Sequence, residues 1–579
     1  MYQIRFVNQG VTSEVAGGLL SEVCANAGFP LNLVCGGRGT CGKCNVWVER
    51  NGVREEVLAC REEITGDLAV YLTEEQLSRA AAIMTEGHSA HTTVFVPSVS
   101  KRCFSRQELI PEHCGAYLDC QNIDVLRKFS LLFAEHDVRK VTFTSFRGEV
   151  IDVEAGDTTS QLYGGAVDIG TTSVVLYAYD LTTGKLLRTE STLNGQIARG
   201  ADVINRILHT LENPDGLREL SERIAATINE LLAGVEEHIP GFCSNLYHMV
   251  LCGNSTMQHL FLQLNPAGLS ADPFVNVTAK MIRIPASQTG LNLPGPATVE
   301  FLPLLGGFVG ADTASVLLTL PETQGCHMMV DLGTNGEIAV GNSEGYRVAS
   351  TACGPALEGG NIACGMRGTN GAIEKISIQE DVITYRVIGG EAPKGLCGSA
   401  IIDAVAELRR ADVIDPSGRL LTAAEYREMH PGSALADCMG TVDNSSPAFF
   451  FVRGENSVYL SQHDVRQIQL AKSSIFSGCV TLLAEAGYAL DQVDAFYLSG
   501  AFGNYIDVGN ALYIGLLPPV KRDHIISIGN GAGQGVQLCL LNRAQIDRCR
   551  ELPTRVEHLE LATSATFMEE YIMNMNFLN

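Results

Sequence analysis

Two short segments of this chain share one pattern, and that pattern constrains the fold of its larger part. AVDIGTTSVVLYAYD begins at Ala166, and MVDLGTNGEIAVGN begins at Met329. Each reads as an apolar strand that ends near an aspartate, followed by a Gly-Thr turn and a second apolar strand. The two aspartates, Asp168 and Asp331, are 163 residues apart. The repeat therefore predicts two similar half-domains that face each other across a cleft.

The chemistry of this turn suits a nucleotide. Backbone N–H groups of a glycine turn bind phosphate oxygens, threonine hydroxyls add donors, and an aspartate before the turn holds Mg²⁺ through water. A single hairpin of this kind could equally be an ordinary buried hairpin, but two matching copies favour the nucleotide. Asp168 and Asp331 are the predicted Mg²⁺-side carboxylates. The predicted phosphate contacts are Gly170, Thr171, Thr172, Gly333, Thr334 and Asn335.

A third element, DAFYLSGAFGNYID, occupies residues 494–507. Its apolar strand runs into a turn of small residues, where a planar base can lie against the backbone, so Gly500 and Gly503 are the predicted adenosine contacts. The three elements together resemble the superfamily of actin, sugar kinases and heat-shock-chaperone ATPases. No GxxxxGK[ST] sequence occurs, which argues against a P-loop ATPase. Glu337 and Asp312 are the candidates for the base that orients the attacking water, and capping or salt-bridged carboxylates are the alternative for both.

The N-terminal region carries a cluster of cysteines, in CGGRGTCGKC at residues 35–44 and in EEVLACREE. Four thiolates, from Cys35, Cys41, Cys44 and Cys60, can hold two irons, and the glycines let the loop fold tightly with N–H groups aimed at the sulfurs. Zinc is the alternative, but it usually takes two CxxC-like pairs and this region has one. The flanking text predicts strands in YQIRFV and NVWVER and a short helix in SEVCANAGFP. This order resembles the β-grasp [2Fe–2S] ferredoxins and implies electron transfer.

The sequence divides into several domains of mixed α/β and α+β class. Residues 1–78 are the predicted ferredoxin-like domain, and 79–100, which are small, polar and aperiodic, are a predicted linker. Residues 101–160 are a small α+β domain, with a helix in QNIDVLRKFSLLFAEH and a hairpin in KVTFTSFRGEVIDVEAG. Residues 161–579 are the predicted actin-like ATPase domain, with lobes at 161–328 and 329–579.

Composition limits the partners and the compartment. The net charge of −24 argues against nucleic-acid binding, and no apolar run of about 18 residues or secretion signal is evident, so we expect a cytoplasmic protein without membrane contact. In such a chain the 18 cysteines are thiols, metal ligands or core residues rather than disulfides. His259 lies in an apolar stretch and is predicted to be a core histidine rather than a cobalt ligand.

Several further segments narrow the resemblance from the ATPase superfamily to one family within it. The cysteine-rich N-terminus occurs together with NGQIARGADVINRI, CGNSTMQHLFL, LPLLGGFVGADTAS, TACGPALEGGNIACGMRGTNGAIE, GLCGSAIIDAVAEL and LSGAFGNYID. This combination resembles the reductive activators of corrinoid proteins over most of the chain. The resemblance implies that ATP, Mg²⁺, a [2Fe–2S] cluster and a low-potential electron donor return a corrinoid protein from Co(II) to Co(I) in an anaerobic methyltransferase system such as O-demethylation. It also implies a homodimer.

Other functions remain open at this point. The chain could be an ATP-gated redox sensor, or an activator of a non-corrinoid radical enzyme similar to the 2-hydroxyacyl-CoA dehydratase activators. Those activators place one [4Fe–4S] cluster between two subunits, whereas this chain has its own ferredoxin-like domain. A sugar kinase would leave that domain unexplained. Activators of methylamine systems carry [4Fe–4S] clusters on C-terminal cysteines, but Cys539 and Cys549 stand alone in this sequence.

Overall fold

The computed structural model separates into two compact units, which are described one at a time. One unit, called the outer unit because it includes both ends of the chain, comprises Met1–His88, Pro321–Asn530 and Leu559–Asn579. The other, called the central unit because its residues are internal to the sequence, comprises Ser89–Leu320 and Gly531–His558. The structure describes residues 2–8, 11–15, 17–27, 44–50, 52–72, 95–108, 120, 122–135, 137–199, 202–333, 335–366, 368, 370–442, 445–454, 456–500 and 506–577. Of the predicted linker, only residues 95–100 fall within these ranges.

The N-terminal segment forms a five-stranded mixed sheet with one helix. The sheet order is β2-β1-β5-β3-β4, and β1 and β5 are its parallel pair. Ile4 and Phe6 in β1 are buried while Gln3 and Arg5 are exposed, as strand alternation requires. The order is that of a β-grasp sheet, and the predicted strands and helix are confirmed. The elements are β1 (Tyr2–Phe6), β2 (Val11–Val15), α1 (Leu20–Asn26), β3 (Asn45–Arg50), β4 (Val53–Leu58) and β5 (Leu68–Tyr71).

A small α+β subdomain follows, as the sequence predicts. Three antiparallel strands, β6 (Val99–Ser105), β7 (Lys140–Phe146) and β8 (Glu149–Ala155), pack against helix α4 (Ile123–Ala134). Asn122 caps the start of this helix: its side chain accepts a hydrogen bond from the Asp124 N–H and so satisfies one of the free donors of the first turn. The rings of Phe104, Phe129 and Phe143 meet in the core between them.

The central unit is built on a six-stranded sheet of order β11-β10-β9-β12-β14-β13. Every residue of β12 is buried, which is expected for a parallel strand covered on both faces. Helix α6 packs against β10 and β11, and α13 packs against β9 and β12. The strands of this sheet are β9 (Tyr163–Ile169), β10 (Ser173–Asp180), β11 (Lys185–Leu193), β12 (Leu246–Gly253), β13 (Ile282–Pro285) and β14 (Thr298–Phe301). The short strand β26 (Val556–His558) is within the residues of this unit but is not part of this sheet. The helices are α5 (Val203–Glu212), α6 (Gly216–His238), α7 (Ser255–Phe261), α8 (Ala311–Thr319), α13 (Gly531–Leu541) and α14 (Arg543–Glu551).

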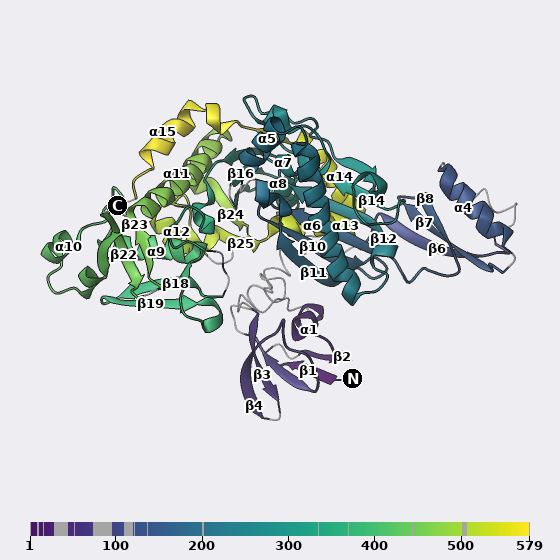
Figure 1. Ribbon diagram of the computed structural model, residues 1–579, viewed down its shortest axis with the longest axis horizontal. Helices are drawn as coiled ribbons and strands as arrows, with labels where there is room; N and C mark the ends of the chain where they lie inside the picture. The colour runs from purple at the N-terminus through teal and green to yellow at the C-terminus, as the bar shows by residue number, and fades with distance from the viewer. Residues whose placement is uncertain are drawn as a thin grey trace. The chain divides into compact units, whose positions relative to one another are not determined.

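The outer unit contains a sheet with the strands β25-β24-β15-β16-β17 in that order. The long helix α11 packs against β16 and β17, and Figure 1 shows α11 beside β16. The main-sheet strands are β15 (Cys326–Leu332), β16 (Gly336–Asn342), β17 (Gly345–Thr351), β24 (Val493–Ser499) and β25 (Ile525–Gly529). Two smaller sheets contain β18 (Ala372–Gln379), β19 (Val382–Val387), β20 (Gly395–Leu396), β21 (Met439–Val442), β22 (Ser446–Val452) and β23 (Val458–Ser461). The helices are α9 (Gly398–Arg410), α10 (Ala423–Met429), α11 (Gln462–Glu485), α12 (Val508–Tyr513) and α15 (Ala565–Met573).

The two large sheets repeat one topology. In the central unit, the antiparallel strands β11, β10 and β9 are followed by β12 and β14, which run parallel to β9. In the outer unit, the antiparallel strands β17, β16 and β15 are followed by the parallel strands β24 and β25. The sequence echo therefore reflects a structural repeat, as predicted. Within the described parts of the chain, no helix is both long and apolar enough to cross a membrane.

Candidate functional site

The first predicted phosphate turn joins β9 to β10. The N–H of Gly170 donates to the carbonyl of Ser173 at 2.9 Å and closes the turn. A Cβ atom at Gly170 would lie 2.7 Å from that carbonyl oxygen, so the turn requires glycine. Thr171 and Thr172 follow at the half-buried tip. The sequence therefore builds a tight turn with two adjacent hydroxyl groups.

Buried polar side chains hold this turn in place. The Asn194 backbone N–H donates to the Thr172 carbonyl at 3.0 Å, and its side-chain Nδ2 donates to the Gly170 carbonyl at 2.9 Å. Asn254 Nδ2 donates to Thr171 Oγ1 at 2.9 Å. Arg206, which is fully buried, donates from Nη2 to the Thr171 carbonyl. The sequence assigned no role to these three side chains, although NGQIARGADVINRI and CGNSTMQHLFL contain them. Because they fix both threonines, the turn is organised before any ligand binds.

Two of the predicted carboxylates lie together in the central unit. Asp168 is near the end of β9, and Asp312 is in the first turn of α8. Burial and the nearby charge of Asp168 raise the pKa of Asp312 to about 6. The Cys252 thiol, whose pKa is raised well above its usual value by burial and by Asp168, lies 3.7 Å from Asp168 Oδ1. The thiol is therefore a protonated neighbour, and the paired carboxylates suit a divalent cation or a water molecule.

The second predicted phosphate turn joins β15 to β16. Asp331 and Glu337 are directly opposite each other across this hairpin. The Gly333 N–H donates to the Asn335 carbonyl at 3.0 Å, and the Cys353 thiol contacts the Gly333 carbonyl at 3.4 Å. Glu337 is buried, with Ser350 Oγ at 3.4 Å from Oε1. Thr334 lies outside the described residues.

The predicted adenosine turn begins at Gly500, directly after β24. Its φ of +100° favours glycine, and its N–H donates to the Gly529 carbonyl at 2.9 Å. A Cβ atom there would lie 2.4 Å from the Leu332 carbonyl oxygen. The turn is therefore packed against the end of β15. Gly503 lies outside the described residues.

Two predicted cluster cysteines are close together in the β-grasp sheet. Cys44 and Cys60 are both buried, and the Ala59 N–H donates to the Cys44 carbonyl at 3.0 Å. They therefore fit a shared site at one end of β3 and β4. Cys24 is in the same core, and burial raises its pKa to about 12. Cys35 and Cys41 lie outside the described residues.

His259 is a core histidine, as predicted. It is fully buried, with Nδ1 at 2.7 Å from the Ser255 carbonyl, and Nε2 accepts from the Val277 N–H at 3.1 Å. Burial lowers its pKa. Both ring nitrogens are therefore engaged within the fold.

Comparison with known proteins defines the class first. A family model described as the C-terminal domain of RACo, the ASKHA domain, matches residues 325–579, and one described as the RACo middle region matches residues 163–321. The first match identifies an actin-like ATPase domain over residues 325–579 and confirms the predicted superfamily.

Full-length relatives then identify the family. The chain is 43% identical over 576 residues to the corrinoid activation enzyme RamQ of Eubacterium limosum, covering 96% of both chains. It is 24% identical over 434 residues to the Co(II) methylated amine-specific corrinoid protein reductase of Methanosarcina barkeri, covering 72% of this chain and 77% of that protein. A solved structure of a reductive activator for corrinoid, iron-sulfur protein matches with a TM-score of 0.75 and 27% identity, covering 100% of this chain and 98% of the other. The chain belongs to the family of corrinoid activation enzymes, which confirms the resemblance.

Proposed function

We propose that this protein is an enzyme that uses ATP to return a corrinoid protein from Co(II) to Co(I) by delivering one electron. The observation that carries the proposal is the 43% identity to a corrinoid activation enzyme over 96% of both chains. The partner is then a corrinoid protein of a methyltransferase system, such as one for O-demethylation, and a low-potential donor supplies the electron. The protein acts in the cytoplasm as a homodimer.

The β-grasp sheet is the proposed electron-transfer domain. Cys35, Cys41, Cys44 and Cys60 are the proposed ligands of a [2Fe–2S] cluster, and the adjacent, buried Cys44 and Cys60 support this assignment. When bound, the cluster supplies a one-electron redox centre. The strands β3 and β4 fix the spacing of these two cysteines, and their burial excludes water from the thiolates.

The two repeated hairpins are the proposed ATP contacts. Asp168 and Asp331 would hold Mg²⁺ through water, and Gly500 and Gly503 would contact the adenosine. The proposed phosphate contacts are Gly170, Thr171, Thr172, Gly333, Thr334 and Asn335.

Asp312 is the preferred base for hydrolysis. With a pKa of about 6, its carboxyl is mostly ionised at pH 7, yet it is basic enough to take a proton from the attacking water. It comes from α8 and meets Asp168 of β9, so a metal-bound phosphate and a water could be positioned together. Glu337, opposite Asp331, is the second candidate.

ATP is required because reduction is uphill. A plant-type [2Fe–2S] centre has a reduction potential of about −400 mV, and the family resemblance implies a lower potential for the Co(II)/Co(I) couple. Each ~59 mV uphill costs about tenfold in equilibrium for one electron. We propose that ATP binding changes the affinity for the corrinoid protein and its cobalt coordination, and that hydrolysis resets the complex.

An anaerobic reduction assay tests the proposal. Reduced protein is mixed with a panel of Co(II) corrinoid proteins, and Co(I) is followed in the visible spectrum with and without Mg-ATP. We expect Co(I) only with ATP, no Co(I) with Cys44→Ser despite retained ATP binding, and no Co(I) with Asp168→Asn despite a retained cluster spectrum. Equal Co(I) without ATP would refute the coupling. A complete absence of Co(I) across the panel, with cluster and ATP binding intact, would favour the redox sensor.

A further inference from the structure

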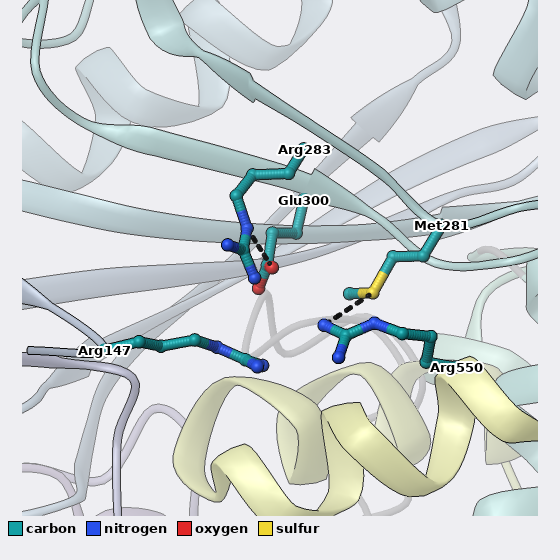
Figure 2. Close-up of a pocket in the computed structure, with 5 residues that line it drawn as sticks. All are labelled: Arg147, Met281, Arg283, Glu300 and Arg550. Atoms are coloured by element: carbon teal, nitrogen blue, oxygen red, sulfur yellow. Dashed lines mark hydrogen bonds and ion pairs between the residues drawn. The ribbon is translucent and has the colours of Figure 1, made fainter. Parts of the chain in front are cut away.

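An arginine-lined pocket of about 360 Å³ lies in the central unit. None of its lining residues belongs to the two predicted phosphate hairpins. Its lining comes from four places in the fold: the turn between β7 and β8 provides Arg147, β13 and the residue before it provide Arg283 and Met281, β14 provides Glu300, and α14 provides Arg550. Figure 2 shows the three guanidinium groups directed toward one another around a common space. Three like charges converge there in a chain whose net charge is −24.

The first acidic group of the pocket is already engaged. Glu300 Oε1 accepts from Arg283 Nε at 2.8 Å, and Oε2 lies 3.0 Å from Nε2 of the buried His248. The Glu300 side chain is completely buried. Arg283 and His248 therefore occupy the two oxygens of Glu300, and neither oxygen is paired with Arg147 or Arg550.

The second acidic group serves two arginines at once. Asp547 Oδ1 accepts from Arg147 Nη1 and from Arg550 Nη1, each at 2.9 Å. One carboxylate thus balances two guanidinium groups. In addition, Arg147 Nε and Nη2 are buried and have no hydrogen-bond partner. Buried donors without acceptors are costly, so this geometry calls for an acceptor that the chain does not provide.

We propose that this pocket binds a phosphate group, as inorganic phosphate or as part of a phosphomonoester. Guanidinium groups present paired N–H donors that match the oxygens of phosphate. The three arginines exceed the two carboxylates, Glu300 and Asp547, by one positive charge, which a phosphate anion would neutralise. The unsatisfied Nε and Nη2 of Arg147 form one such donor pair. Arg550, held by Asp547 beside Arg147, provides the second charge. None of the residues that line this pocket belongs to the proposed ATP contacts.

Calorimetric titration of the full-length protein with inorganic phosphate tests the proposal. The titration is done at low ionic strength, with a saturating non-hydrolysable ATP analogue and Mg²⁺ present so that the proposed ATP contacts are already filled. We expect one phosphate per chain. Arg147→Gln and Arg550→Gln should each weaken binding about tenfold, the effect of losing a charge-assisted hydrogen bond. Asp547→Asn should strengthen it severalfold, because the two arginines lose their shared carboxylate. Arg555→Gln, which removes an exposed arginine paired with Glu551 outside the pocket, is the matched control and should bind normally.

Further titrations distinguish free phosphate from a phosphomonoester and test whether the pocket prefers phosphate to another anion. Glucose 6-phosphate binding more tightly than inorganic phosphate would identify a phosphomonoester, and the reverse would identify the free ion. Tighter binding of acetate than of phosphate would overturn the assignment. So would an absence of heat with wild-type protein, or unchanged phosphate affinity in both arginine variants and in Asp547→Asn. A control titration omits the ATP analogue and is repeated on Asp168→Asn. Phosphate that binds in the arginine-lined pocket should bind equally well to this variant, whereas phosphate that binds at the hairpins should bind more weakly. This result therefore does not depend on the proposed ATP site.

Discussion

Gly500 lies so close to Asp331 that a Cβ atom at residue 500 would come within 2.8 Å of the Asp331 carboxylate Oδ1. Two segments that are far apart in the sequence therefore meet at the proposed nucleotide contacts. Gly500→Ala would displace Asp331 or the turn after β24. We expect the variant to lose at least about tenfold in affinity for ATP, a free-energy change of about 1.4 kcal/mol, measured by calorimetry.

Gly487→Ala is the matched control for that substitution. Gly487 has a φ of +78°, so alanine there also meets a backbone penalty, of about 1 kcal/mol, but no atom lies within 4 Å of its added Cβ. Both variants should unfold at lower temperature, whereas only Gly500→Ala should lose ATP binding. Normal ATP affinity in Gly500→Ala would exclude this turn from the nucleotide site.

The raised pKa of Asp312 predicts a pH dependence of ATP hydrolysis. A base must be ionised, so the rate should fall below about pH 6, the pKa that burial and Asp168 impose on this carboxyl. Asp312→Asn should reduce the rate at pH 7.5 by about 100-fold or more while ATP still binds. Steady-state ATPase rates between pH 5 and about 8.5 measure the profile. Glu337→Gln is the comparison, and a large loss only in that variant would assign the base to Glu337.

The same pKa predicts the sign of a stability change. The folded protein keeps a proton on Asp312 up to about pH 6, whereas the unfolded chain releases it near pH 3.8. The carboxylate therefore destabilises the fold increasingly as the pH rises between these values, and the penalty is complete above them. Asp312→Asn should stabilise the protein more at pH 7.5 than at pH 4, as measured by thermal melting. Equal stability changes at both values would contradict the raised pKa.

Much of the fold follows from local sequence patterns. Alternation in YQIRFV and NVWVER corresponds to β1 and β3, and the repeated pattern of an aspartate, one apolar residue and a Gly-Thr pair corresponds to the two hairpins. Periodicity cannot predict which late segments of the chain pack against much earlier ones. Residues 531–558 pack with the central unit, although the predicted lobe 329–579 groups them with the preceding sequence. The glycine and small residues of α13 that allow this packing, such as Gly535 at Ser315, are visible as contacts only in the structure.

The candidate site was predictable in its backbone features and less so in its supporting side chains. Glycine and aspartate at the turns are visible in the sequence because the turn itself needs them. Arg206 and Asn254 act through partners that are distant in sequence, so no local pattern indicates their role. The same reason applies to Cys539 and Cys549, which are isolated in the sequence but are neighbours in the fold, where burial and the Cys549 thiol raise the pKa of Cys539 well above its usual value.

Asn254 has two functions that one substitution can separate. Its side chain caps α7 by accepting from the Met257 N–H at 3.0 Å, and it donates to Thr171 Oγ1 at 2.9 Å. Serine preserves a cap acceptor but is too short to reach Thr171. Asn254→Ser should therefore raise the KM for ATP about tenfold with a stability change within about 0.5 kcal/mol. Asn265→Ser, at another cap, should leave the KM unchanged, and an unchanged KM in both would remove Asn254 from the site.

The buried cysteines of the β-grasp sheet offer a sharp test of the proposed cluster ligands. Cys44 and Cys24 are both completely buried in one core, so replacing either with serine imposes a similar packing change. Only Cys44 is a proposed ligand, and the Cys24 thiol stays protonated because burial raises its pKa to about 12. Thiolates are the ligands that iron–sulfur clusters require. Cys44→Ser should lose the visible absorbance and the bound iron of the purified protein, whereas Cys24→Ser should retain both. Loss of iron in Cys24→Ser with retention in Cys44→Ser would show that the cluster is held by a different set of thiols.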